Sequence, residues 1–208
     1  KTVKMFETIH GSHLYGLSRP DSDVDFYRVE MVAGDIYVPF QAAKKIKSKQ
    51  KIMDGDDLMS ITLTDFMVKA HEGVPQALEA MFSEHPTAKG PLDPFRRSYY
   101  LDTANFTKTY RRTCLNFARL GLEDEKAIAI LTPEPTDADM QRSRTRESLR
   151  KEKPRRVERN GMEKYRRHAL RLMFNYEEGI ERGRFQPTMT EAQKEYIYTN
   201  MELDDIAY

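Results

Sequence analysis

Alternating hydrophobic and polar positions mark the first third of the chain. The segment VKMFETI (3–9) alternates and runs into His-Gly-Ser, DVDFYRVEMV (23–32) alternates more regularly, and DLMSITLT (57–64) is a third such run. Because the side chains of a strand point alternately to its two faces, we predict three strands. Residues 33–55 keep no clear period, and we expect a loop with some helix there.

A helical period of hydrophobic residues follows the third strand. Thr64 can cap a helix that has Asp65 in its first turn and ends at Gly73. PQALEAMF (75–82) begins with a proline, which favours the first turn of a helix. Prolines then interrupt the pattern over residues 86–94. Beyond them the hydrophobic spacing predicts helices over 102–120, 123–131, 160–182 and 190–201.

Strands and helices therefore occupy different parts of the chain, which predicts an α+β protein. We place a boundary near residue 90, with an α+β segment over residues 1–90 and a helical region over residues 91–208. The chain has 208 residues. This exceeds the roughly 150 residues of an average domain, so a core with an appended region fits the length.

Composition narrows the choice of function. The 34 basic and 33 acidic residues nearly cancel, yet thirteen basic and four acidic residues lie between Arg142 and Arg171. This segment is either an anion-binding surface or a solvated face. Cys114 is the only cysteine. A single cysteine excludes an internal disulfide and a thiolate zinc site, and it fits a reducing cytoplasm. Cys114 falls in a helical pattern, where cysteine packs as a small hydrophobic residue. No apolar run reaches the ~20 residues that a membrane-spanning helix needs.

Two aspartates one residue apart begin the second predicted strand. Asp23 and Asp25 share one face of that strand, where their charges repel each other unless a cation lies between them. Mg²⁺ prefers such hard oxygen ligands and often bridges carboxylates and substrate phosphates. The alternative is a solvent-facing polar turn, because residues 20–23 all favour turns.

A Gly-Ser pair closes the first predicted strand, ten residues before Asp23. Gly11 lets the backbone approach a phosphate closely, and Ser12 offers an N–H and a hydroxyl to an anion. Two-metal phosphoryl transfer normally needs a third carboxylate from a neighbouring strand. Asp56 and Asp57, at the start of the third strand, are the candidates.

The arrangement of Gly-Ser, a ten-residue loop, Asp-x-Asp and a later acid resembles the nucleotidyltransferases of the DNA polymerase beta superfamily. GSHLYGLSRPDSDVDF (11–26) and DLMSITLTDFMVKAHEGVPQALEAMF (57–82) are similar to the bacterial and phage group that is assigned to RNA repair, with Val74-Pro75 in place of Asn-Pro. Lys164, His168 and Arg171-Leu172 match a helix of the same group. The resemblance covers most of residues 5–85 and 160–205.

This resemblance implies a small mixed sheet with flanking helices as the catalytic core over residues 1–90, followed by a helical region that contributes to nucleotide or acceptor binding. It implies Asp23, Asp25 and Asp57 as catalytic ligands of two Mg²⁺ or Mn²⁺ ions. Asp56 replaces Asp57 if the strand starts one residue earlier, whereas Asp65 is expected to begin a helix. Relatives commonly carry Arg where this chain has His13, which changes a charged donor into a neutral one.

The nucleotide-binding residues expected on these grounds are Gly11, Ser12, His13, Tyr15, Lys164, His168 and Arg171. Tyr15 could equally fill the core, and the basic residues could form a solvated helix face. His10 is a candidate substrate contact, or simply a hydrogen-bonded residue at a strand end. Arg96, Arg97, Tyr99 and Tyr100 combine basic and aromatic groups as surfaces for single-stranded nucleic acids do.

The expected activity is metal-dependent transfer of NMP from an NTP such as ATP to an acceptor hydroxyl, with release of pyrophosphate. The expected acceptor is an RNA 3′ end, such as that of a tRNA. Two alternatives stay open: transfer to a protein or small molecule, and a nucleotide- or RNA-binding module without turnover. We expect no membrane partner and a cytoplasmic protein, bacterial or phage-encoded and acting in the host cytoplasm.

Overall fold

The computed structural model of the chain describes residues 2–20, 22–32, 49–53, 56–121 and 159–201, with the backbone alone for 32, 49–53, 56–57, 159–162 and 201. The elements are, in chain order, β1 (Thr2–His10), α1 (Gly11–Tyr15), β2 (Asp25–Val32), β3 (Lys49–Met53), β4 (Asp56–Thr62), α3 (Leu63–His71), α4 (Pro75–Phe82), α5 (Asp93–Ser98), α6 (Thr103–Leu120), α9 (Arg159–Arg182) and α10 (Glu191–Met201).

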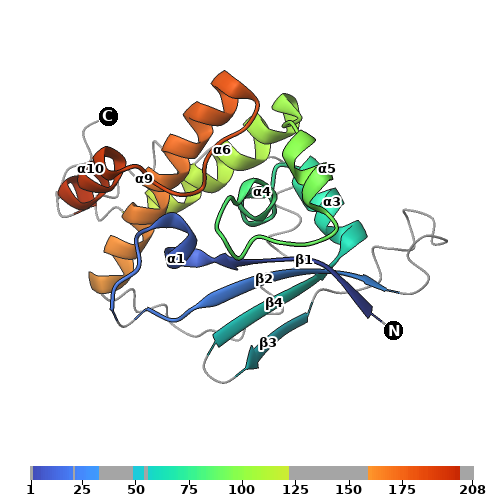
Figure 1. Cartoon of the computed structure of the whole chain (residues 1–208). Helices are drawn as coiled ribbons and strands as arrows, with labels where there is room; N and C mark the ends of the chain where they lie inside the picture. Colours follow the sequence, from blue (N-terminus) through green and yellow to red (C-terminus); the bar gives the residue numbers. More distant parts are fainter. Residues whose placement is uncertain (1, 21, 33–48, 54–55, 122–158, 202–208) are drawn as a thin grey trace, which may run out of the picture.

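Four strands form one mixed sheet in the order β1-β2-β4-β3. β1 and β2 are antiparallel, β2 and β4 parallel, and β3 and β4 antiparallel. Helices α3, α4, α6 and α9 lie on the same side of this sheet (Figure 1). The prediction of a mixed α/β protein with a small mixed sheet is thereby confirmed.

β3 is the strand that the sequence analysis missed. Its residues KQKIM lie in the segment for which we expected a loop with some helix, so that expectation is wrong here. β3 lies at the edge of the sheet and is held by pairing with β4. Lysines are common on edge strands because they discourage pairing with other chains, and they hide the hydrophobic alternation of a strand.

The helix starts need one correction. The N-cap of α3 is Thr62, whose Oγ1 accepts the backbone N–H of Asp65 at 3.2 Å, and not Thr64. The cap lies three residues before the donor, as N-cap geometry requires. α4 has the predicted bounds 75–82, whereas α5 was not predicted because it starts inside the proline-rich interruption. The helix expected over 123–131 lies outside the described residues.

A buried cluster of hydrophobic residues joins the sheet to the helices. Phe6 of β1, Tyr27 of β2 and Phe66 of α3 share it with Phe106 of α6 and Leu172 of α9, and all five are at most 1% exposed. It therefore includes residues from both sides of residue 90. The division at that residue stays a prediction.

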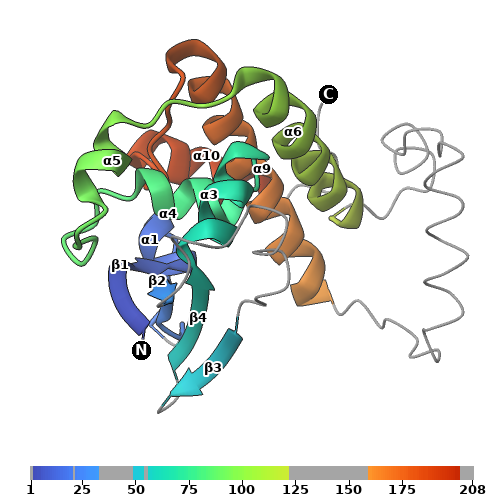
Figure 2. The ribbon, with the colours of Figure 1, turned by 90° about the vertical axis from the view of Figure 1, so that its right-hand side faces the viewer.

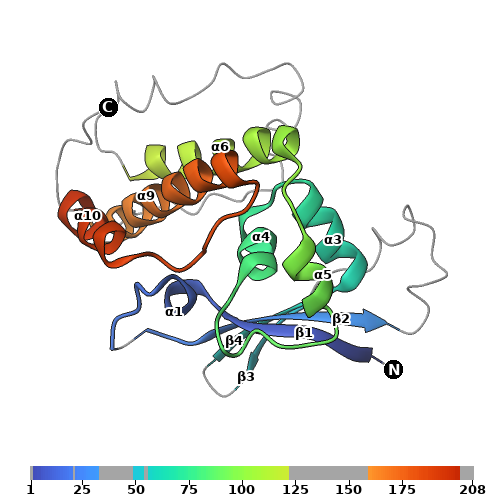
Figure 3. The ribbon, with the colours of Figure 1, turned by 45° about the horizontal axis from the view of Figure 1, so that its top comes forward.

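α9 runs beside α6 and carries α10 on its other flank (Figures 2 and 3). Cys114 of α6 donates its S–H to the Ala169 carbonyl of α9, and burial raises its pKa to about 11. Leu14 and Leu17 pack with Leu170 of α9 in a second cluster. That contact brings α9 against α1. No helix in the described part of the chain has the length and apolar character needed to cross a membrane.

Candidate functional site

A cavity of about 490 Å³ opens where β1, α1, the start of β2 and α9 meet. Most of the site residues that the sequence predicted line it, namely Gly11, Ser12, Tyr15, Asp23, Asp25, Lys164, His168 and Arg171. We call it the first cavity. The chain reaches it from segments about 140 residues apart, because α9 packs against α1, the helix that begins with the Gly-Ser pair.

One wall of the first cavity is acidic. Asp23 is exposed in the loop before β2, and Asp25 is the first residue of β2 and is half-buried. Gly11 fits against Asp25 so closely that a Cβ at position 11 would lie 2.2 Å from Oδ2 of Asp25. Gly11 also has a φ of 66°, which other residues rarely adopt. Any other residue at position 11 would therefore displace the Asp25 carboxylate.

The third carboxylate candidate is next to this wall in the sheet. The parallel register of β2 and β4 pairs Asp25 with Asp57, so their backbones are about 4.8 Å apart. Asp56 is one residue earlier and pairs with Met53 of β3. Among the residues whose side chains are described, no three His, Cys, Asp or Glu groups are arranged to hold a metal ion. The side chains of Asp56 and Asp57 lie outside that set.

The facing wall is a basic stripe on α9. Lys164, Arg167, His168 and Arg171 all line the first cavity. Their spacing of i, i+3, i+4 and i+7 puts them on one face of the helix. Arg166 lies elsewhere, because it is buried and its Nε donates to the carbonyl of Gly121.

Arg171 is the most constrained residue of this stripe. It is 4% exposed, its Nη1 donates to Oε1 of Glu79 at 2.6 Å, and its guanidinium stacks 3.7 Å from the centre of the Tyr15 ring. Burial alone would lower the pKa of Arg171, but Glu79 raises it. Arg171 is thus a fixed positive charge in the wall, already paired with one carboxylate.

Glu79 of α4 connects three elements around this charge. Its Oε2 accepts the hydroxyl of Tyr15 at 2.6 Å and lies 3.3 Å from Nε2 of His10. Glu79 is 1% exposed. Burial alone would raise its pKa, but Arg171 holds that pKa well below its usual range. The pair therefore stays ionised and locks α4, α9 and α1 together.

His168 brings a neutral ring to the same wall. Burial, followed by the charge of Arg171, lowers its pKa from 6.5 to about 3. Its ring packs against Phe117 of α6 at 5.2 Å between centroids. A neutral imidazole offers one hydrogen-bond donor and one acceptor, so at pH 7 His168 can contact a ligand without adding charge.

His13 is not among the residues that line the first cavity. Its Nε2 lies 3.2 Å from the carbonyl oxygen of Ser22, so it braces the loop that leads to Asp23. The expected contact between His13 and a nucleotide stays a prediction.

Sequence reasoning missed several groups at this site. Arg167 and Gln76 line the cavity, and Glu79 organises its wall. The signal for Arg167 was available, since it shares the helical spacing of Lys164 and Arg171. Glu79 is the one charge in the apolar segment ALEAMF, which is itself a sign of a paired buried carboxylate.

Comparison of the chain with models of protein families, with curated protein sequences and with solved structures found no match. The family resemblance therefore depends on the motifs and their spacing alone.

Proposed function

We propose that the protein is a metal-dependent nucleotidyltransferase of the polymerase beta type, which transfers NMP from an NTP to an acceptor hydroxyl. One observation carries the proposal: the first cavity has carboxylates on one wall and a basic stripe on the other, with Gly11 and Ser12 between them. A nucleoside triphosphate with its divalent cations presents the complementary charges. The cations face the carboxylates and neutralise phosphates, while the basic side chains hold the remaining phosphate oxygens.

The donor set fits Mg²⁺ or Mn²⁺. Asp23 and Asp25 supply hard carboxylate oxygens, and the strand register favours Asp57 over Asp56 as the third acid. Two bound ions would supply charge neutralisation at the attacking and leaving oxygens. A binding module without turnover would lack one of these acids, so that alternative depends on whether the side chain of Asp57 faces Asp25.

The residues of the basic wall have distinct roles in this proposal. Lys164 and Arg167 contact the phosphates, and His168 donates a neutral hydrogen bond. Arg171 is paired with Glu79 through Nη1, so it contributes a fixed field and positions Tyr15 instead of closing on the substrate. Such preorganised charges lower the barrier because they need no reorganisation during reaction.

The acceptor that we propose is an RNA 3′ hydroxyl. Its oxygen loses its proton to solvent water and attacks the α-phosphorus, the bond from that phosphorus to the bridging oxygen breaks, and pyrophosphate leaves with the displaced electron pair. The basic composition of residues 142–171 supports a polyanionic acceptor.

The test is transfer of label from each α-labelled NTP to total cellular RNA in the presence of Mg²⁺ or Mn²⁺. Asp25→Asn should lower the transfer rate by about 100-fold or more, as loss of one preorganised electrostatic group does. Asp65→Asn is the matched control, because it removes the same charge from the surface of α3, where Asp65 pairs with Lys69. It should transfer like the parent protein.

The outcomes separate the alternatives. Label on protein or on a small molecule would replace the RNA acceptor, and NTP binding without transfer to any acceptor would favour a binding module. Equal activity of Asp25→Asn and the parent would show that the metal-ligand assignment is wrong. Asp56→Asn and Asp57→Asn are assayed as two separate single variants. The third acid is the one whose substitution abolishes transfer.

A further inference from the structure

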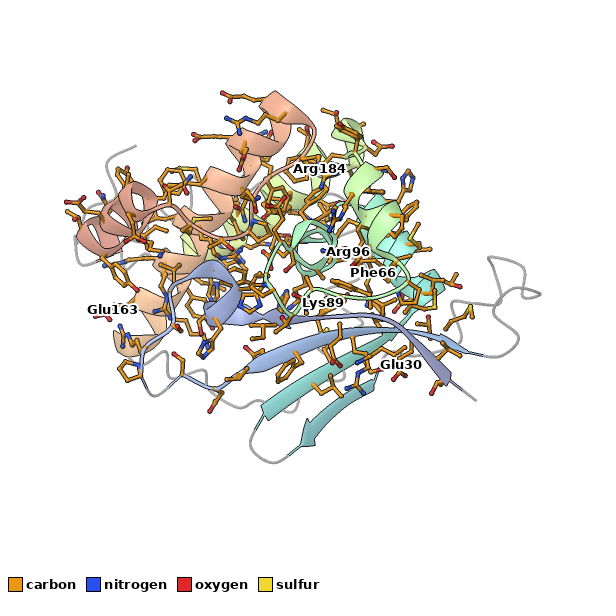
Figure 4. The ribbon with its side chains drawn as sticks, in the orientation of Figure 1. Glu30, Phe66, Lys89, Arg96, Glu163 and Arg184 are labelled. Carbon is orange, nitrogen blue, oxygen red and sulfur yellow. The ribbon has the colours of Figure 1, made fainter. Side chains whose placement is uncertain are left out.

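A second cavity of about 670 Å³ lies at the other end of α4. Its lining includes Ser83 at the end of α4, Lys89 in the connection to α5, Asp93, Arg96 and Arg97 of α5, and Arg184 after α9. Arg96, Lys89 and Arg184 gather beside α4 and α5, whereas Glu163 at the start of α9 lies far to the left (Figure 4). The second cavity is therefore separate from the first.

The connection that carries Lys89 is fixed to the sheet. The backbones of Lys89 and Glu7 of β1 exchange hydrogen bonds of 3.3 and 3.4 Å, and Thr8 bonds to Ser83 through their hydroxyls at 2.7 Å. Gly90 packs so closely on β1 that a Cβ there would lie 2.1 Å from the Met5 carbonyl oxygen. The rim of the second cavity is thus held by the outer edge of β1.

Positive charge exceeds negative charge around this cavity. Lys89, Arg96, Arg97 and Arg184 oppose only Glu84 and Asp93. The side chains of Lys89 and Arg97 are exposed and make no ion pair or hydrogen bond with the described residues. They are consequently available to a ligand.

The deepest of these charges is incompletely satisfied. Arg96 is 5% exposed, its Nη1 donates to Asp93 at 2.8 Å and its Nη2 to the Ser83 carbonyl, but its Nε has no partner among the described residues. Burial lowers the pKa of Arg96, and the charges of Arg97 and Arg184 lower it further. An anion in the cavity would offset this repulsion.

Aromatic rings lie open beside the charges. Tyr100 is 66% exposed and Phe95 is 39% exposed. The guanidinium of Arg184 lies 5.8 Å from the centre of the Tyr100 ring, and it is anchored by donating to the carbonyls of Arg97 and Tyr99. Rings that alternate with basic groups bind single strands, because bases stack on the rings while phosphates meet the charges.

We propose that the second cavity, with Tyr100 and Phe95 beside it, binds the backbone and bases of a single-stranded RNA acceptor. The proposal rests on the proposed function, which puts the 3′ hydroxyl of that strand in the first cavity. Gln76 and Phe82 of α4 line the first and second cavities respectively. Their separation along α4 is about 9 Å, so one strand can reach both cavities.

The test measures binding of a labelled single-stranded RNA of about 12 nucleotides by fluorescence anisotropy, without NTP or metal, over a range of salt concentrations. Lys89→Ala combined with Arg97→Ala should raise Kd about tenfold or more and lower the salt slope by about 2, one for each lost phosphate contact. Tyr100→Ala should raise Kd at least about fivefold without changing the salt slope, since it removes stacking and no charge.

The matched control is Lys108→Ala with Arg111→Ala, which removes two exposed charges from α6 outside both cavities. It should change Kd less than about twofold, as surface charges away from the ligand do. NTP binding to the double variant of the second cavity should equal that of the parent protein.

Three results would overturn the proposal: no RNA binding by the parent, equal RNA binding by the parent and the Lys89/Arg97 variant, or binding of a phosphorylated peptide in place of RNA. Failure of the proposed function gives a different pattern. In that case RNA binding responds to the variants as expected, but no label is transferred by the parent protein.

Discussion

Two buried arginines lie at opposite ends of α4, and the positive charge of each is compensated in a different way. Arg171 stacks 3.7 Å from the Tyr15 ring and Arg96 stacks 3.8 Å from the Phe6 ring. Arg171 has a partner, Glu79, that is as deeply buried as itself. Arg96 has Asp93, which is 25% exposed, and a backbone carbonyl. The Nε of each arginine has no hydrogen-bond partner among the described residues, so the two differ in the burial of the carboxylate partner and not in their stacking.

This difference indicates which arginine can respond to a ligand. The pKa of Arg171 is raised by Glu79, whereas that of Arg96 is lowered, because burial outweighs its pairing with Asp93 and the charges of Arg97 and Arg184 lower it further. A compensated charge keeps its position whether or not a ligand is present. An under-compensated charge gains stability when an anion arrives. In our proposals Arg171 therefore belongs to the fixed wall of the first cavity, and Arg96 belongs to the RNA-binding surface of the second cavity.

The largest expected effect comes from breaking the compensated pair. Glu79→Gln leaves Arg171 buried with no counter-charge, so the free energy of unfolding should fall by about 3–5 kcal/mol. Chemical denaturation measures it. The control Glu177→Gln removes the same charge from an exposed position of α9 and should change stability by less than about 0.5 kcal/mol. A small effect of Glu79→Gln would remove the contrast between the two arginines.

The same pair predicts a loss of stability in acid. The pKa of Glu79 is lower in the folded protein than its usual 4.5, so the pair stabilises the fold fully above pH 4.5 and this contribution disappears as the pH falls below it. Glu79→Gln should therefore unfold with a weaker pH dependence below pH 4.5 than the parent protein. A parallel pH dependence of the two proteins would show that Glu79 is not ionised in the fold.

His168 predicts a second and smaller dependence of the stability on pH. Its pKa falls from 6.5 to about 3 on folding, so its contribution is complete above pH 6.5 and declines as the pH drops toward 3. At pH 5 the loss should be about 2 kcal/mol, from 1.5 pH units at about 1.36 kcal/mol each. His168→Gln should remove this slope, and His71→Gln, at an exposed position of α3, should keep it. Denaturant titrations between pH 7 and 5 compare them.

Breaking the pair at the other end of α4 should cost less. Asp93→Asn should lower the free energy of unfolding by about 1 kcal/mol, because Asp93 is partly solvated and the Ser83 carbonyl still accepts from Arg96. The stacking on Phe6 also remains. A loss as large as that of Glu79→Gln would mean that Arg96 depends on its carboxylate just as Arg171 does.

Local sequence patterns predicted much of this molecule because the elements concerned are locally determined. β1, β2, β4 and the helices α4, α6 and α9 each follow their own hydrophobic period. The motif from Gly11 to Asp25 and the helix face with Lys164 and Arg171 were predicted separately, and the fold places both at one cavity. β3 was not predicted, because its strand conformation depends on pairing with β4 and its lysine-rich sequence does not show a strand pattern.

The charge pairs could not be predicted in the same way. Glu79 and Arg171 are 92 residues apart, and nothing near either residue indicates the other. The second cavity depends on the pairing of Lys89 with β1 and on Arg184 reaching back to α5, which are contacts between distant segments. Arg96, Arg97 and Tyr100 suggested a nucleic-acid surface in the sequence, but the sequence did not reveal the cavity beside them.

The smallest effect on stability belongs to the exposed charges of the second cavity. Lys89→Ala with Arg97→Ala should leave the free energy of unfolding within about 0.5 kcal/mol of the parent, or raise it slightly, because it removes Arg97, one of the two arginines whose charges oppose that of Arg96. Thermal unfolding measures this. A ligand-binding surface should show this combination of intact stability and weakened RNA binding, whereas a structural ion cluster would lose stability. A fall in stability above about 1 kcal/mol would assign Lys89 and Arg97 to the scaffold and make the two ends of α4 equivalent.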